Sequence, residues 1–334
     1  MPYTADDVTL YIPYFNAQAT IEACLKSAEN QSQKAKRIFI IEDGSQQPLP
    51  EQLNVEVIAH SKNLGLAAGR NTALKHCQTK LLAAIDADVL LQPNWLEEML
   101  NCLNKQADNI AGLGGKMIEK NCTDLADQWR AKHMAQHWGE KEILNPRFLF
   151  GANTLFKTDA LTKVGGFDER CRTNNEDCTI SQALYAADYQ LIYTPKAKAQ
   201  HLRKDELHSI IPAYWGWHHM KGLQEGDYDS VEGIIDRIKR VNFGIGKYRY
   251  ELDQKDGDTQ FLELDSLIPY IFCIRDLTLF CQRQKEHAFP DLLPLLKKHL
   301  SEEIIETYIK DLLPKETAEQ PWQKLYLDEL KQNL

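Results

Sequence analysis

Residues 81–91 read Leu-Leu-Ala-Ala-Ile-Asp-Ala-Asp-Val-Leu-Leu, an apolar run interrupted by Asp86 and Asp88. A short apolar run bounded by polar segments is typical of a strand buried on both faces. Two ionised carboxylates there are costly unless a cation neutralises them, and hard divalent cations prefer oxygen ligands. Since side chains two residues apart share one face of a strand, we expect both carboxylates to face one site. Two solvated or capping aspartates at a strand end are the alternative.

Apolar runs alternate with helical patterns over the first 200 residues. Strands are predicted at 8–13, 37–41, 55–59, 81–91, 110–118, 147–157 and 189–194, and helices at 21–28, 63–76, 93–103, 158–164 and 174–184. Residues 122–145 form a less periodic, partly helical excursion. This alternation implies an α/β fold with a doubly wound, mainly parallel sheet flanked by helices.

Polar residues follow three of these predicted strands. Tyr14 and Asn16 follow the first, Asp43 follows the second, and Asp86 and Asp88 lie at the fourth. Ligands of doubly wound sheets bind beyond the carboxyl ends of the strands. We therefore expect the three clusters to converge on one rim.

Long helical patterns replace the strand signals from Asp205 onward. We predict two domains, a catalytic domain at 1–204 and a mainly helical C-terminal region at 205–334. The C-terminal region contains an apolar cluster rich in aromatic residues, formed by Ile210, Ile211, Tyr214, Trp215, Trp217 and Met220. Core packing or a homo-oligomer interface explains this cluster, and a peripheral helix at a membrane surface is the alternative. The apolar block at 267–281 is shorter than the roughly 20 residues of a membrane span.

Composition excludes several classes of protein. A formal net charge of -9 argues against a nucleic-acid partner, because phosphate backbones attract a basic surface. The first residues contain no basic region followed by an apolar stretch, so we expect no secretion signal and a cytoplasmic location, with peripheral contact at the cytoplasmic membrane face as the alternative. Eight cysteines without a Cys-x-x-Cys pair indicate reduced thiols and not a zinc site.

Short motifs stand in a fixed order along the chain. They are Ile-Pro-Tyr-Phe-Asn at 12–16, Glu-Asp-Gly-Ser at 42–45, the segment Asn63 to Asn71, Asp-Ala-Asp at 86–88, Gly-Gly-Phe-Asp-Glu at 165–169, Glu176-Asp177, and His201. Each motif is weak alone, but the ordered set covers about 200 residues. It resembles family 2 glycosyltransferases of the GT-A fold.

The resemblance implies a role for individual residues. Those matching the family's nucleotide-sugar site are Pro13, Tyr14, Asn16, Asp43, Arg70, Asp86 and Glu176. Asp43 would read the uracil edge of a UDP-sugar, and Arg70 would lie near the nucleotide or its phosphates. Asp88 would bind the metal, His201 would contact the metal or the diphosphate, and Asp177 would be the catalytic base.

Simpler explanations exist for three of these residues. Glu176 and Asp177 precede a predicted helix, where acidic side chains complement the macrodipole. A lone histidine such as His201 after a strand is often a packing or surface residue.

Two departures from the family pattern stand out. Glu42 occupies a position where the family more often has aspartate, and no Gln-x-x-Arg-Trp motif follows Asp177. Processive polysaccharide synthases of the family carry that motif together with membrane helices. The sequence therefore favours the transfer of a single sugar.

Sugar transfer from a nucleotide diphosphate needs a cation for the leaving group, a base for the acceptor and a pocket for both. Carboxylate and imidazole ligands favour Mn²⁺ or Mg²⁺. In-line attack by a hydroxyl of a glycan, polysaccharide or glycolipid acceptor inverts the anomeric configuration. A nucleotidyltransferase on a related α/β scaffold and a non-catalytic nucleotide-sugar-binding scaffold protein are the alternatives.

Overall fold

The computed structural model describes residues 1–47, 49–50 and 52–284, and the chain divides into two compact units. The first unit comprises 1–122 and 131–204, and the second comprises 123–130 together with the residues from Asp205 onward. The division between Lys204 and Asp205 falls where the sequence changes from strand to helix patterns. Residues 285–334 of the predicted C-terminal region lie outside the described residues.

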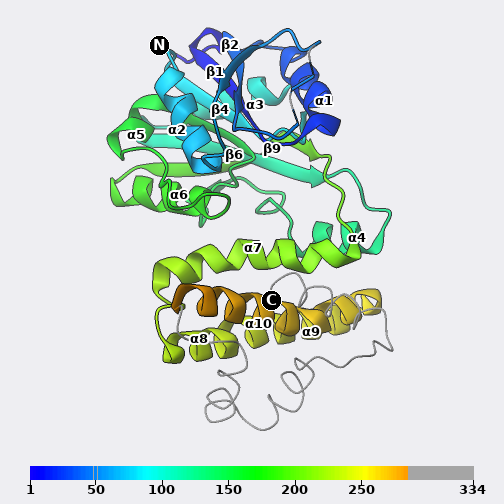
Figure 1. The fold of residues 1–334 in the computed structure, drawn as a ribbon. Helices are drawn as coiled ribbons and strands as arrows, with labels where there is room; N and C mark the ends of the chain where they lie inside the picture. The colour runs from blue at the N-terminus through cyan, green and yellow to red at the C-terminus, as the bar shows by residue number, and fades with distance from the viewer. Residues whose placement is uncertain (48, 51, 285–334) are drawn as a thin grey trace. The chain divides into compact units, whose positions relative to one another are not determined.

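A mixed β-sheet forms the centre of the first unit (Figure 1). Its strand order is β3 (Glu56–Ala59), β2 (Arg37–Glu42), β1 (Val8–Tyr14), β4 (Leu81–Ile85), β8 (Asn153–Lys157), β6 (Ile110–Glu119), β9 (Gln190–His201) and β5 (Val89–Leu91), with β7 (Ile143–Leu144) also pairing with β9. The run from β3 to β4 is parallel, as expected. Beyond it, β8 is antiparallel to both β4 and β6. The sequence did not predict this direction, because the period of apolar residues indicates a strand but not which way it runs.

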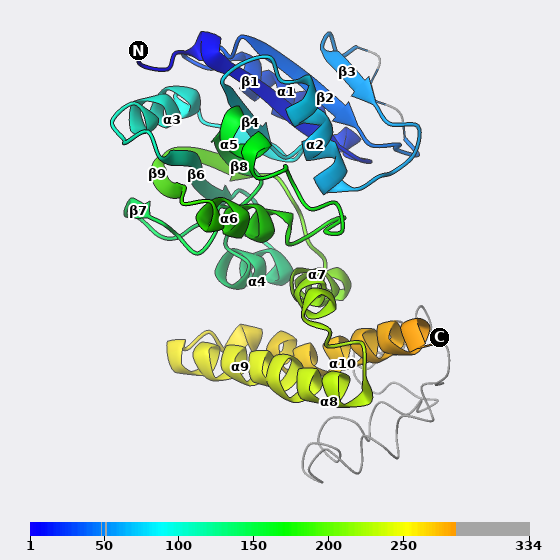
Figure 2. The same cartoon turned by 90° about the vertical axis from the view of Figure 1, so that its left-hand side faces the viewer.

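Helices cover both faces of this sheet (Figures 1 and 2). One face packs against α1 (Gln18–Glu29) and α3 (Trp95–Leu103), and the other packs against α2 (Leu66–His76), α5 (Thr158–Lys163) and α6 (Glu176–Ala186). Successive residues of β1 separate the two cores: Leu10 and Ile12 join the first, and Tyr11 joins the second. This arrangement confirms the predicted α/β fold with helices on both sides.

The prediction of one continuous strand over residues 81–91 is wrong. The segment breaks into β4 and β5, and Asp86, Ala87 and Asp88 form the turn between them. The two strands have different neighbours, since β4 pairs with β1 and β8 while β5 pairs with β9. Alternation within a strand therefore does not explain why the two aspartates lie near each other. The predicted strand at 147–157 is likewise shorter, because only Asn153–Lys157 joins the sheet.

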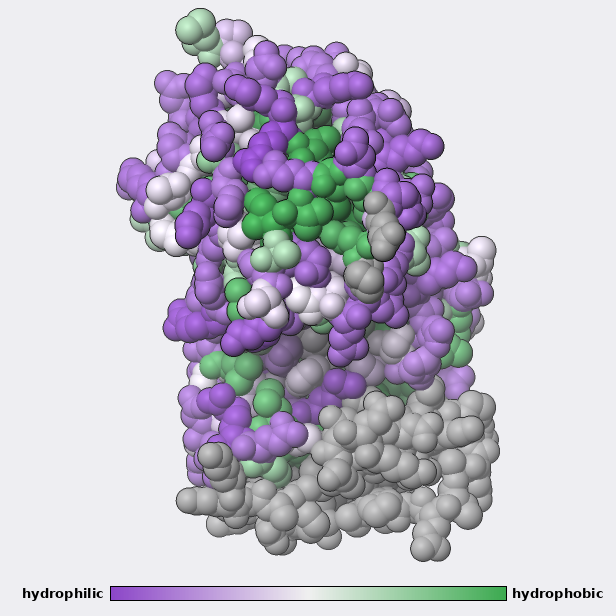
Figure 3. Space-filling view, turned by 45° about the horizontal axis from the view of Figure 1, so that its top comes forward, coloured by the Kyte–Doolittle hydropathy of each residue, from purple (hydrophilic) through white to green (hydrophobic). Residues whose placement is uncertain are grey.

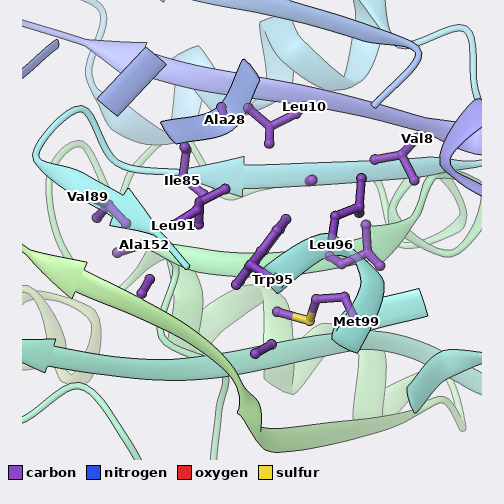
Figure 4. Packing of buried hydrophobic residues seen from close by; sticks show 14 of the residues in the cluster. Val8, Leu10, Ala28, Ile85, Val89, Leu91, Trp95, Leu96, Met99 and Ala152 are labelled. Carbon is purple, nitrogen blue, oxygen red and sulfur yellow. The ribbon is translucent and has the colours of Figure 1, made fainter. Parts of the chain in front are cut away.

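Trp95 of α3 lies at the centre of the first core (Figure 4). Its side chain is fully buried among residues from the sheet and from α3 itself. The indole Nε1 donates a 2.6 Å hydrogen bond to Asn153 Oδ1 on β8. The side-chain Nδ2 of Asn153 in turn donates a hydrogen bond to the Ala197 carbonyl of β9 at 3.4 Å. The indole thus joins a helix to the part of the sheet where strand direction reverses.

The described part of the second unit is helical. It contains α7 (Leu207–Glu225), α8 (Val231–Arg237), a π-helical segment (Ile238–Phe243), α9 (Gly244–Asp256), a 3-10 turn (Thr259–Phe261) and α10 (Leu262–Gln284), together with residues 123–130, which include the first part of α4 (Leu125–His133). The fully buried Asp276 accepts hydrogen bonds from Trp215 Nε1 and Arg237 Nε, both at 2.7 Å. Burial of Ile210, Ile211 and Tyr214 places much of the predicted aromatic cluster in the interior of this unit. Among the described helices, none combines the length and apolar character needed to span a bilayer.

Hydrophobic side chains also reach the surface. Figure 3 shows one face of the molecule on which they gather within mostly hydrophilic surroundings. In the first unit Phe15, Val57 and Leu64 are among the large hydrophobic residues that stay exposed. Phe15 follows β1 directly, at the rim where the strands end.

Trp95→Phe should destabilise the first unit by about 1–3 kcal/mol, because it leaves the buried Asn153 oxygen without its indole donor. Urea unfolding followed by circular dichroism measures this loss. Phe15→Leu, at an exposed aromatic of the same unit, is the control and should stay within about 0.5 kcal/mol of wild type. An unfolding free energy for Trp95→Phe equal to that of the control would contradict the role of the indole bond.

Candidate active site

A pocket of about 330 Å³ lies at the carboxyl ends of β1, β2 and β4. Its walls come from the loops after these strands, from the start of α2 and from Thr173. The predicted site residues that line it are Pro13, Tyr14, Asp43, Asp86 and Asp88. The three clusters of the sequence prediction thus meet at one rim, because parallel strands carry their carboxyl ends to the same edge.

Asn16 shapes this rim by joining two loops. Its backbone has a positive φ of 51°, a conformation that asparagine tolerates better than most residues. Its Oδ1 accepts hydrogen bonds from the backbone N–H groups of Gln46 and Gln47 at 3.0 and 3.3 Å. Its own N–H donates to Ser45 Oγ at 3.1 Å. The Asn16 side chain therefore holds the loop after β1 against the loop after β2.

Asp43 is buried and fixes the loop that leads into α2. Its Oδ1 accepts from the Leu64 N–H at 2.8 Å and lies 2.7 Å from His60 Nδ1. Its Oδ2 accepts from the Gly65 N–H at 2.8 Å. Gly65 has a φ of +100°, and a Cβ there would lie 2.7 Å from the Arg172 carbonyl oxygen, so no other residue suits this position. A carboxylate offers about four acceptor positions, and these contacts occupy three of them.

Arg70 of α2 is only 1% exposed and lies beneath the rim. Its Nη1 donates to the Tyr11 hydroxyl at 3.2 Å, and its Nε and Nη2 both donate to Glu176 Oε1 at 3.2 Å. Nη2 also lies 3.5 Å from Asp86 Oδ1. The guanidinium therefore joins β1, the turn after β4 and the start of α6 through buried charges.

Gly151 explains how the chain covers this ion pair. A Cβ at this residue would lie 2.6 Å from Arg70 Nη2 and 3.2 Å from Glu176 Oε1. The backbone N–H of Gly151 donates to Asp177 Oδ2 at 3.3 Å. A glycine lets the loop before β8 pass close over the Arg70–Glu176 pair and reach the neighbouring aspartate.

Glu176 and Asp177 begin α6 directly after Asn175, which has a positive φ of 71°. Burial raises the pKa of Glu176 to about 8, with the charge of Asp177 acting in the same direction and Arg70 opposing it. Burial also raises the pKa of Asp177, while hydrogen bonds from the N–H groups of Gly151 and Cys178 oppose the shift. A carboxylate with a raised pKa is a better proton acceptor near neutral pH.

Asp88 and His201 face each other across the β5–β9 edge. His201 Nε2 lies 3.2 Å from Asp88 Oδ2, and His201 Nδ1 lies 3.0 Å from Glu119 Oε2. Burial alone would lower the pKa of His201, but the hydrogen bonds to Asp88 and Glu119 raise it to about 9. The histidine is therefore a paired residue of the site and not a surface side chain.

These residues fit a divalent cation. Oxygen and nitrogen atoms that bind one metal at about 2.0–2.2 Å lie roughly 3 Å apart when the angle between them is near 90°. The 3.2 Å between Asp88 Oδ2 and His201 Nε2 meets this condition. Asp86, at the same pocket, presents a buried Oδ1 atom that accepts no hydrogen bond, although Arg70 lies nearby.

Four residues that shape this site were not predicted from the sequence. Tyr11, His60, Glu119 and Gly151 hold Arg70, Asp43, His201 and Asp177 respectively. Gly151 is 26 positions from Asp177 and Glu119 is 82 from His201. His60 is 17 positions from Asp43 and Tyr11 is 59 from Arg70, so no local motif connects these residues to their partners. Only the glycine at 151 gave a signal, since a glycine beside a strand indicates a close approach.

Residues 9–165 match the protein-family model for Glycosyl transferase family 2. Over these residues the chain is similar to glycosyltransferase family 2. The match contains the pocket loops, Arg70 and the Asp86–Asp88 turn, and it ends before Glu176, Asp177 and His201. The motifs from Ile12 to Asp88 therefore lie inside the matched region, whereas those from Gly166 onward lie beyond it.

Individual relatives cover the chain only in part. The pre-mycofactocin glycosyltransferase of Mycobacterium tuberculosis is 26% identical over 224 residues, which are 63% of this chain and 46% of the relative. The poly-beta-1,6-N-acetyl-D-glucosamine synthase of Staphylococcus epidermidis is 24% identical over 204 residues, which are 58% of this chain and 49% of the relative. The chain thus spans about half the length of these curated relatives.

Among solved structures, the chain is similar to GalNAc-T7 with UDP, GalNAc and Mn²⁺. The TM-score is 0.49 at 14% sequence identity, and the similarity covers 63% of this chain and 44% of the other.

Glu176→Gln should change how stability depends on pH. The pKa of Glu176 is raised from 4.5 to about 8, so the folded protein keeps a proton that the unfolded chain releases. The stabilising contribution is fully present below pH 4.5 and is lost as the pH rises toward 8. Thermal melts between pH 5 and 8 should show a smaller loss of stability with rising pH in Glu176→Gln than in wild type. Glu29→Gln, at an exposed glutamate on α1, is the control, and a variant slope equal to that of the control would contradict the assignment.

Proposed function

We propose that this protein is an inverting, metal-dependent glycosyltransferase that moves a single sugar from a nucleotide-diphosphate sugar, a UDP-sugar, to a hydroxyl acceptor. The match of residues 9–165 to the family 2 model supports glycosyl transfer. The observation that carries the proposal is the convergence of Asp86 and Asp88 on one pocket, with His201 at hydrogen-bonding distance from Asp88. Burial raises the pKa of Asp86, and the charge of the nearby Asp177 adds to this shift, which supports a base close to the same pocket.

Most of the predicted residues have a part in this proposal. Asp88 and His201 would hold Mn²⁺ or Mg²⁺, which as a Lewis acid would stabilise the charge that grows on the leaving diphosphate. Pro13 and Tyr14 wall the nucleotide, and Asp43 keeps one acceptor position for an N–H of the base. Arg70 is too deeply buried to reach a phosphate directly, so we assign it the task of holding Asp86 and Glu176.

Asp177 would take the proton of the acceptor hydroxyl. The acceptor oxygen then forms a bond to the anomeric carbon on the face opposite the diphosphate, and the bond from that carbon to the phosphate oxygen breaks. The nucleoside diphosphate leaves with the electron pair. This in-line displacement inverts the anomeric configuration. The N–H groups of Gly151 and Cys178 fix the Asp177 carboxylate in place, so little reorganisation is needed during the reaction.

The acceptor class is inferred from the family resemblance. We propose a hydroxyl of a glycan, a polysaccharide or a glycolipid. A nucleotidyltransferase is separable by its products. Release of UDP from a UDP-sugar supports the proposal, whereas release of pyrophosphate from UTP would overturn it. Failure of every nucleotide sugar to raise the melting temperature in the presence of Mn²⁺ would favour a non-catalytic scaffold.

Asp88→Ala should abolish Mn²⁺-dependent binding of UDP while the circular dichroism spectrum stays that of the wild type. The substitution removes a metal ligand at a turn and no packed apolar group. Calorimetric titration of UDP with and without Mn²⁺ measures the effect. Asp108→Ala, at an exposed aspartate before β6, is the matched control and should bind as wild type does. Unchanged Mn²⁺-dependent affinity in Asp88→Ala would remove this residue from the metal site.

Asp177→Asn should lower kcat by about 10²–10⁴-fold and leave the Kd of the donor near its wild-type value, because general-base catalysis is lost while the side-chain shape is kept. If Asp177 only complements the N-terminus of α6, the substitution costs a fraction of a kcal/mol of stability and turnover persists. Transfer rate and donor Kd measured on one preparation separate the two cases. Near-wild-type turnover would exclude Asp177 as the base.

A further inference from the structure

Glu119 is a buried carboxylate that the family motifs do not include. It is the last residue of β6, and its register partner on the parallel strand β9 is His201, the last residue of that strand. Both carboxylate oxygens lie close to His201 Nδ1, at 3.0 and 3.1 Å. The side chains of Glu119 and His201 are 7% and 5% exposed, so the pair is largely removed from water.

The opposite edge of the imidazole faces Asp88, in the turn just before β5. Val89 of β5 is the register partner of His201, and the Leu202 N–H donates to the Asp88 carbonyl at 2.8 Å. The Lys120 N–H likewise donates to the His201 carbonyl at 3.0 Å. Backbone pairing on both sides of β9 therefore places His201 between Glu119, at the end of β6, and Asp88, directly before β5.

This order determines what each ring nitrogen can do. The carboxylate at Nδ1 accepts a hydrogen bond from Nδ1–H, which fixes the direction of the ring and keeps the proton on that nitrogen. A cation that binds between Nε2 and Asp88 would displace the proton from Nε2, since a metal-bound imidazole carries no proton on the bonding nitrogen. Histidines that bind metals usually donate their second N–H to a carboxylate or a carbonyl in this way.

We propose that Glu119 is a positioning residue that holds the His201 imidazole for binding of a divalent cation together with Asp88. This inference rests on the metal-dependent reaction proposed above and adds the residue that sets the histidine in place. Glu119 itself does not contact the metal, because its carboxylate occupies the far nitrogen of the ring. If Glu119 served stability alone, it would join β6 to β9, and its replacement would not change metal binding.

The test measures Mn²⁺ binding directly. Full-length protein with UDP is titrated with Mn²⁺ by calorimetry, and pulsed electron paramagnetic resonance of the bound Mn²⁺ detects coupling to a ligated imidazole nitrogen. Glu119→Ala should weaken Mn²⁺ binding by about 10–100-fold and reduce the nitrogen coupling. Glu119→Gln keeps an acceptor for Nδ1–H and should fall between wild type and Glu119→Ala in both measurements. Should Glu119→Ala fail to fold, Glu119→Gln against wild type still carries the comparison.

Two reference variants frame these results. His201→Ala should lose the nitrogen coupling completely. Glu98→Ala removes an α3 carboxylate that accepts a 3.3 Å hydrogen bond from Asn94 and should leave Mn²⁺ binding unchanged. Wild-type affinity and nitrogen coupling in both Glu119 variants would overturn the inference while leaving the proposed function intact. Wild-type protein that binds Mn²⁺ without any nitrogen coupling would also overturn it, and wild-type protein that binds no Mn²⁺ with UDP would instead overturn the proposed metal-dependent function.

Discussion

A single buried cation, Arg70, is the interaction on which the site depends. It contacts Tyr11, Glu176 and Asp86 from three separate elements, and its charge offsets the cost of burying the Glu176 carboxyl group and the Oδ1 atom of Asp86. Removing one partner of such a cluster is far more costly than never forming it, since an uncompensated charge stays behind. Arg70 therefore constrains where α6 begins and where the turn after β4 lies, although it does not line the pocket.

The backbone around Arg70 and Glu176 adopts unusual conformations and close approaches to accommodate them. Gly151 must lack a side chain so that the loop before β8 can lie against Arg70 and Glu176, and its N–H then reaches Asp177. Asn175 adopts a positive φ so that α6 starts with two acidic residues facing the cluster. Local strain and the absence of a side chain are thus found where the proposed base is held, as is common at functional sites.

The pocket and the proposed metal site are organised by different interactions. Around the pocket, polar side chains bind the backbone of neighbouring loops: Asn16 binds residues 46 and 47, and Asp43 binds residues 64 and 65. At the proposed metal site, strand register sets the arrangement, since β9 places His201 between Glu119 on β6 and Asp88 beside β5. The loops fix the shape of the pocket, whereas the sheet fixes the direction of the ligands.

The sequence by itself determined the α/β class, the helices on both faces, the helical nature of the described region after Asp205, and the clustering of Tyr14, Asp43 and the Asp86/Asp88 pair at one rim. These features follow from local periodicity and from the rule that parallel strands end at a common edge. Tertiary structure alone decided that residues 81–91 break at the two aspartates, that β8 runs antiparallel, and that Arg70 is buried. It also decided that Glu119 faces His201, because that contact joins strand ends 82 residues apart in the chain. Periodicity records which face of an element is apolar and carries no information about which distant strand or charge will lie beside it.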